Sequence, residues 1–101
     1  MKEEVAAEAK YNDALSGILK QVKQDASGTI EKLVTMSGDK TLTLAQRQQA
    51  MGIAGKVAVR ESKDNAKARE LFAKAIAMDP KSDTAKDCES ETGKLKAEEP
   101  K

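Results

Sequence analysis

Side chains of the kinds that catalytic and metal sites need are scarce in this chain. The sequence has no histidine and one cysteine, Cys88, which lies in the segment KDCESE. Without imidazole, the chain lacks the usual near-neutral general base, the common zinc ligand and the triads that depend on histidine. The carboxylates next to Cys88 disfavour its thiolate, so we expect a small, half-buried side chain rather than a nucleophile. The sequence therefore predicts no catalytic residue.

The acidic residues and the glycines also lack the spacing of known ligand sites. Asp and Glu are scattered along the chain, with no calcium-loop spacing and with no pair singled out for acid–base catalysis. Neither of the phosphate-binding patterns, GxGxxG and GxxxxGKS/T, occurs. We therefore expect a protein that is not an enzyme and that holds no metal and no cofactor.

The balance of charge argues against nucleic acid as a partner. The chain has 18 Lys and Arg against 17 Asp and Glu, with the two signs interleaved, and only two aromatic residues, Tyr11 and Phe72. A nucleic-acid binder usually has a basic face and aromatic rings on which bases stack, and neither is present. No apolar run approaches the ~20 residues of a membrane span, and the charges within 3–23 disfavour a membrane-surface helix. We expect neither a nucleic-acid nor a membrane partner.

The cysteine count and the first residues indicate the cellular compartment in which we expect the protein. One cysteine cannot form an intramolecular disulfide, and the start, MKEEVAAEAK, does not resemble a signal peptide. The expectation is a cytoplasmic protein, unless a leader sequence has been removed.

The apolar periodicity predicts an all-α fold, a small bundle of four to five helices in antiparallel hairpins, as one domain over 1–98. The N-terminal hairpin, 3–37, has a first helix reaching about Lys23 with an apolar stripe at helical spacing. The segment DASGT is its turn, where Gly28 tolerates positive φ and Ser27 or Thr29 can cap the second helix. Gly38 suits the left-handed position beyond the end of that helix.

A second hairpin is predicted over 44–79. Thr43 and Gln46 have the capping-box spacing at its start, Asp64 can cap its second helix, and Pro80 ends it. Gly52 and Gly55 lie inside the first helix of this hairpin, which indicates either close approach of another backbone or simple tolerance of glycine in a weak helix. A capping helix follows over 82–92, with Ser82 as its cap and Gly93 as its end, and a disordered tail occupies 94–101.

Residues 49–80 resemble one tetratricopeptide repeat, a 34-residue antiparallel helix pair. The second half follows the pattern A-x3-F-x2-A-x4-P through Ala68, Phe72, Ala75 and Pro80. The first half departs from it: the Trp, Leu-Gly and Tyr of the repeat are replaced by Gly52, Gly55-Lys56 and Val59, and Lys63 stands at the turn position that is usually Gly. The resemblance implies right-handed superhelical packing. It also implies that the inner face of the helix over 44–61 contacts a peptide through Ala50, Ile53, Val57 and Arg60.

Two functions remain open. The first is a protein–protein interaction module that binds a peptide or a partner helix at those four residues. The second is a structural bundle that self-associates as a homo-oligomer, because a core poor in large side chains leaves apolar surface for a second copy to cover. Under the simplest packing alternative, Ala50, Ile53 and Val57 pack on the N-terminal hairpin and Arg60 remains as a rim charge.

Overall fold

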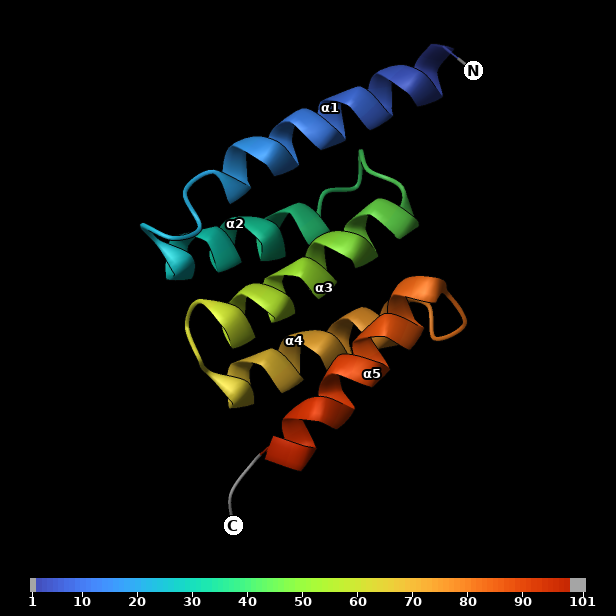
Figure 1. Cartoon of the computed structure of the whole chain (residues 1–101). Helices are drawn as coiled ribbons and strands as arrows, with labels where there is room; N and C mark the ends of the chain where they lie inside the picture. The colour runs from blue at the N-terminus through green and yellow to red at the C-terminus, as the bar shows by residue number, and fades with distance from the viewer. Residues whose placement is uncertain (1, 99–101) are drawn as a thin grey trace.

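The computed structural model describes residues 2–98, with side chains for 10–95, and all regular secondary structure in that range is α-helical. The helices are α1 (Lys2–Leu19), α2 (Ala26–Ser37), α3 (Leu44–Arg60), α4 (Asn65–Met78) and α5 (Asp83–Glu98). Each helix runs antiparallel to the one before it and packs beside it, and α5 also contacts α3 (Figure 1). The Cα atoms span 51 × 33 × 15 Å, so the bundle is a flat slab. The predicted all-α fold of antiparallel hairpins is confirmed.

Local hydrogen bonds define where α3, α4 and α5 begin. Thr43 accepts from the Gln46 N–H at 3.0 Å while the Gln46 side chain accepts from the Thr43 N–H at 3.1 Å, which is the predicted capping box. Asp64 caps α4 by accepting from the Lys67 N–H at 3.0 Å, and the Ser82 hydroxyl accepts from the Ala85 N–H at the start of α5. These three predictions are confirmed.

The turn of the N-terminal hairpin differs from the prediction. The first helix ends at Leu19, four residues early, and α2 starts at Ala26 because Asp25 caps it by accepting from the Gly28 N–H at 3.0 Å. Ser27 and Thr29 are therefore inside α2 and are not its cap. Gly28 has negative φ, and a Cβ there would overlap the Asp25 carboxylate, so a larger residue would displace the side chain that caps α2.

One further expectation about a chain reversal was wrong. Gly38 follows α2 with φ −100°, outside the left-handed region, and its N–H bonds back to carbonyls of the last turn of α2. Among the described non-glycine residues, only Lys63 has positive φ, at 55°, in the turn between α3 and α4. This is the position where the tetratricopeptide pattern usually has Gly, which adopts that conformation without steric cost.

The last helix runs past its predicted end at residue 92. Gly93 is exposed within α5, and the helix continues through it to Glu98. A glycine in a helix costs ~1 kcal/mol relative to Ala, whereas burying a leucine side chain contributes about 1.5–3 kcal/mol. Leu95 is buried, and that burial outweighs the glycine. Residues 94–98 are thus helical, and 99–101 of the predicted tail lie outside the described residues.

The centre of the core is one aromatic ring held against glycine. Phe72 of α4 is fully buried, and a Cβ added to Gly55 of α3 would lie 2.5 Å from its ring carbon Cε1. A Cβ on Gly52 would lie 3.2 Å from the Cys88 sulfur of α5. Both glycines therefore admit a side chain from a neighbouring helix, and the predicted approach of a backbone was wrong.

One buried polar side chain ties together three helix ends. Gln48 of α3 is buried, and its Nε2 donates to the Ala75 and Asp79 carbonyls at 2.8 and 3.0 Å. Its Oε1 accepts from the Ser82 hydroxyl at 2.7 Å. Because every bond reaches the end of α4 or the start of α5, Gln48 fixes the register of α3 against both.

Replacing Gly55 with Ala tests the ring contact. The new methyl group cannot fit against the buried ring, so we expect a loss of about 1–3 kcal/mol in the free energy of unfolding, despite the ~1 kcal/mol gain in helix propensity. Urea denaturation followed by circular dichroism measures this. Gly93→Ala is the matched control: nothing lies within 4 Å of its Cβ, so it should stabilise the fold. Equal effects of the two substitutions would contradict this packing.

Replacing Gln48 with Met tests the contribution of its three hydrogen bonds to stability. Methionine has similar length but forms none of the three hydrogen bonds. The Ala75 and Asp79 carbonyls and the Ser82 hydroxyl would lose their bonds to Gln48, which should lower the free energy of unfolding by about 1–3 kcal/mol. The control is Gln24→Met, at an exposed turn position where the side chain forms no hydrogen bond with another described residue, and it should change stability by less than about 0.5 kcal/mol. Thermal melts of both variants provide the comparison.

Candidate partner-binding surface

The four residues predicted to contact a partner differ in their access to solvent. Ala50 is fully buried, Val57 is 6% exposed, Ile53 is partly buried and Arg60 is exposed. Ala50 therefore packs in the core, where its side chain is not available to a partner. Ile53, Val57 and Arg60 lie together at the C-terminal half of α3.

These three residues line a shallow hollow of about 350 Å³ between the end of α1 and α3. The other lining residues are Leu19 and Val22, from the end of α1 and the following turn, and Lys56 and Glu61 of the α3 segment. The volume is within the ~300–1,000 Å³ range of protein ligand sites. We call this set of seven residues the α1–α3 hollow.

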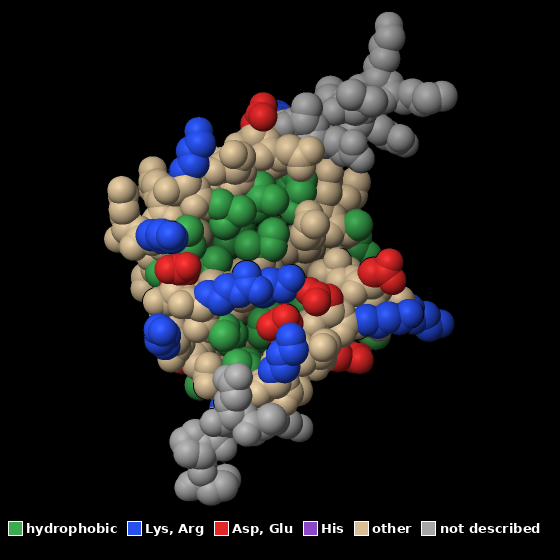
Figure 2. Space-filling model, in the orientation of Figure 1, with side chains coloured by type: hydrophobic (Ala, Val, Ile, Leu, Met, Phe, Trp, Pro, Cys, Tyr) green, Lys and Arg blue, Asp and Glu red, His purple; other side chains and the backbone are tan. Residues whose placement is uncertain are grey.

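Two of its apolar residues were not predicted as part of a site. Leu19 and Val22 belong to the apolar stripe that the sequence assigned to helix packing. Leu19 also lines an adjoining hollow of about 440 Å³ with Asn12, Leu15, Ser16 and Lys20. Figure 2 shows apolar side chains gathered on the face formed by α1, α3 and α5, next to a band of charged side chains. The apolar surface is therefore continuous from α1 to α3.

The charged groups near the hollow hold α3 to its neighbours and border the apolar surface. The Lys56 ammonium and the Asp87 carboxylate are 2.7 Å apart and link α3 to α5. Tyr11 of α1 donates to the Gln49 side chain of α3 at 2.6 Å, and burial raises the pKa of the Tyr11 hydroxyl. These two contacts set the position of α3 between α1 and α5 on this face.

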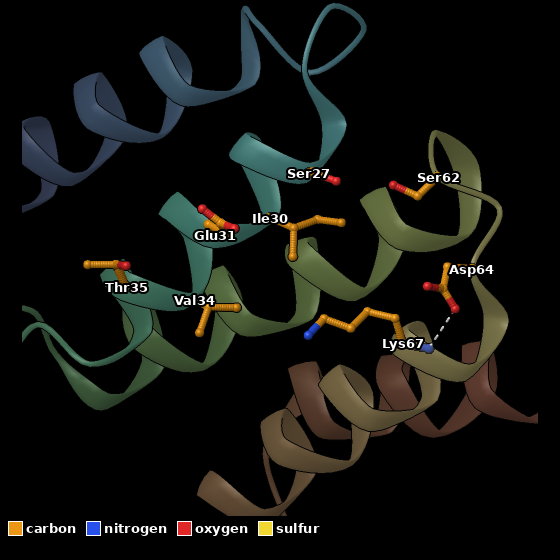
Figure 3. A pocket seen from close by; sticks show the side chains of 8 residues that line it. All are labelled: Ser27, Ile30, Glu31, Val34, Thr35, Ser62, Asp64 and Lys67. Carbon is orange, nitrogen blue, oxygen red and sulfur yellow. Dashed lines mark hydrogen bonds between the residues drawn. The ribbon is translucent and has the colours of Figure 1, made fainter.

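A larger hollow of about 720 Å³ lies between α2 and α4 and has a different lining (Figure 3). Its walls carry mostly hydroxyl and charged groups, together with two apolar side chains: Ser27, Ile30, Glu31, Val34, Thr35, Ser62, Asp64 and Lys67. The Asp64 carboxylate accepts a hydrogen bond from the Lys67 N–H, as the dashed line shows, and the Lys67 side chain points away from Asp64. Hydroxyl and charged groups therefore make up most of the lining of this hollow, in contrast to the mainly apolar lining of the α1–α3 hollow.

Nothing within the described part of the chain points to metal or membrane chemistry. No group of three or more Cys, Asp or Glu side chains there is arranged to hold a metal ion. No described helix combines the length and apolar character needed to cross a bilayer.

Cys88 is more deeply placed than the sequence suggested. Its side chain is fully buried between α5 and α3, near Gly52, and not half-buried. Burial, and then the negative charge of Asp87, raise the pKa of the Cys88 thiol to about 11. The thiol is therefore protonated at neutral pH and packs as a small apolar group.

The thiol's protection can be measured with Ellman's reagent at pH 8. Because burial raises the pKa of the Cys88 thiol from 9.0 to about 11, the thiolate fraction at pH 8 is roughly 100-fold lower than for an unperturbed cysteine, so the folded protein should react at least that much more slowly than the protein in urea. Between the unfolded and folded pKa values only the unfolded state releases the proton, so this group destabilises the fold as pH rises. Equal reaction rates in buffer and in urea would contradict the placement.

No protein-family model matches the chain, and neither a curated protein nor a solved structure matches it. The α1–α3 hollow and the resemblance of residues 49–80 to a tetratricopeptide repeat are therefore the features that bear on function.

Proposed function

We propose that this chain is a non-catalytic interaction module that binds a partner helix or peptide at the α1–α3 hollow. The observation that supports this is the partly exposed apolar lining formed by Leu19, Val22 and Ile53 in the hollow between the end of α1 and α3. Burying apolar surface contributes ~25 cal/mol per Å², and helix-in-groove recognition uses grooves of this kind.

The tetratricopeptide resemblance supports the same face. Phe72 fills the space opposite Gly55, and the small Ala68 and Ala75 are fully buried beside it. The neighbouring α5 packs on both α3 and α4, where the first helix of a following repeat would lie. In the layout that the resemblance implies, the inner face of α3 contacts a peptide, and Ile53, Val57 and Arg60 of that face line the hollow.

Self-association is the competing function. A second copy that covers the α1–α3 hollow would remove the same apolar surface from water. Light scattering over a concentration series separates the two: a constant monomer mass supports a module for a different partner, and a mass that rises to a dimer supports self-association.

The module can be tested by selecting random 16-residue peptides displayed on phage against the monomeric protein. Peptides that occupy the hollow should lose at least ~10-fold in affinity with Ile53→Gln, because a polar amide replaces an apolar contact. Gln retains helix propensity and length, and circular dichroism verifies the fold. Fluorescence anisotropy of the labelled peptides gives the affinities.

The matched control is Leu44→Gln. Leu44 also lies on α3 and is 44% exposed, but it does not line the hollow, so its replacement should leave peptide affinity unchanged. Selected peptides that respond equally to both substitutions, or to neither, would refute the proposed site.

A further inference from the structure

We propose that the segment bound in the α1–α3 hollow is an acidic amphipathic helix of another protein, with apolar anchors flanked by Asp or Glu. This inference rests on the proposed function and adds the chemistry of the partner. Two observations support it: exposed cations lie beside the hollow, and most of the residues that line it belong to helices.

Positive charges that lack partners border the apolar surface. Arg60 lines the hollow, Lys20 lines the adjoining one that shares Leu19, and Lys23 follows Val22 in the chain. All three are exposed, and none forms an ion pair with a carboxylate among the described residues.

The negative charges nearby are fewer and partly engaged. Lys56 is paired with Asp87 at 2.7 Å, which removes one carboxylate from competition. Glu61 is the one carboxylate among the residues that line the hollow. Among the residues that line this hollow and the adjoining one, two free cations, Lys20 and Arg60, thus remain against one carboxylate, Glu61, although the whole chain carries a net charge of only +1. Within a Debye length of about 8 Å, this local excess attracts carboxylates on a docked segment.

The walls favour a helix over an extended segment. Ile53 and Val57 lie within α3, and Leu19 ends α1, so most of the lining backbone is already hydrogen-bonded within helices. An extended peptide would bring main-chain N–H and C=O groups to a surface with few backbone partners for them. A helix satisfies its own backbone and presents side chains at i and i+4, as helix-in-groove partners do.

The mixed charge of the α2–α4 hollow gives no such preference. Glu31 and Asp64 line it together with Lys67, so it offers both signs of charge. A local excess of positive charge therefore distinguishes the α1–α3 hollow from the α2–α4 hollow.

Two labelled 16-residue alanine-based peptides test the inference directly. Both carry leucines at i and i+4, and the flanking positions are Glu in one and Lys in the other. The wild-type protein should bind the Glu peptide about 10-fold more tightly at 50 mM NaCl, and the difference should shrink toward 500 mM, where screening is stronger. Fluorescence anisotropy measures both series.

Reversing the charges on the protein tests the same preference from the other side of the interface. The double variant Lys20→Glu/Arg60→Glu should prefer the Lys peptide. The control Lys32→Glu/Lys86→Glu changes the same number of exposed charges away from the hollow and should keep the wild-type preference. Circular dichroism melts check that the variants remain folded.

The outcomes distinguish the two proposals. Equal binding of the two peptides, with loss of both in Ile53→Gln, would overturn the acidic-partner inference and leave the binding module standing. Binding that is insensitive to Ile53→Gln, or absent for both peptides at about 1 mM, would overturn both proposals. A dimer that Ile53→Gln converts to monomer would make a second copy the occupant, which also overturns the acidic-partner inference.

Discussion

The Phe72 ring packs directly against the backbone of Gly55, and the arrangement of the other helices follows from this contact. A chain with two aromatic residues must place its one phenylalanine where it fills the most space. Because Gly55 has no side chain, α3 approaches α4 closely enough for the ring to be enclosed. Ala68 and Ala75, one helical turn on either side of Phe72, are fully buried in the same interface. The contact therefore sets both the spacing and the register of the α3–α4 pair.

Small side chains at the other interfaces extend this close packing and limit its strength. Gly52 accommodates the Cys88 sulfur from α5, and Ala54, Ala58 and Ala85 are fully buried. Small residues bury little apolar area each, so directional bonds contribute more than they would in a leucine-rich core. The three hydrogen bonds of Gln48 join α3 to the ends of α4 and α5 and compensate for the burial of its amide.

The candidate surface forms where this packing stops. The first helix ends at Leu19 and the chain turns through 20–24, which leaves Val22 outside a helix beside the C-terminal half of α3. No further helix among the described residues covers Ile53 there, whereas Ala50, one turn earlier, is enclosed. Apolar lining and unpaired cations thus meet on the open part of a rigid helix. Such a site requires little reorganisation on binding, which favours docking of a preformed segment.

The sequence alone determined the features that depend on short-range chemistry. The three caps at Thr43, Asp64 and Ser82 could be predicted because donor and acceptor are three residues apart, and the helices could be predicted from periodic apolar residues. The exact cap of α2 was missed because DASGT contains several residues that can cap. Tertiary contacts decided the features that local sequence does not determine. Burial of Leu95 continues α5 through Gly93. Gly55 and Gly52 of α3 pack against the Phe72 ring and the Cys88 sulfur of other helices. The hollow itself joins Leu19 and Val22 to Ile53, more than thirty residues along the chain. Helical periodicity indicates which face of each helix is apolar, but only the packing of α1 against α2 and α3 decides which part of that face stays uncovered.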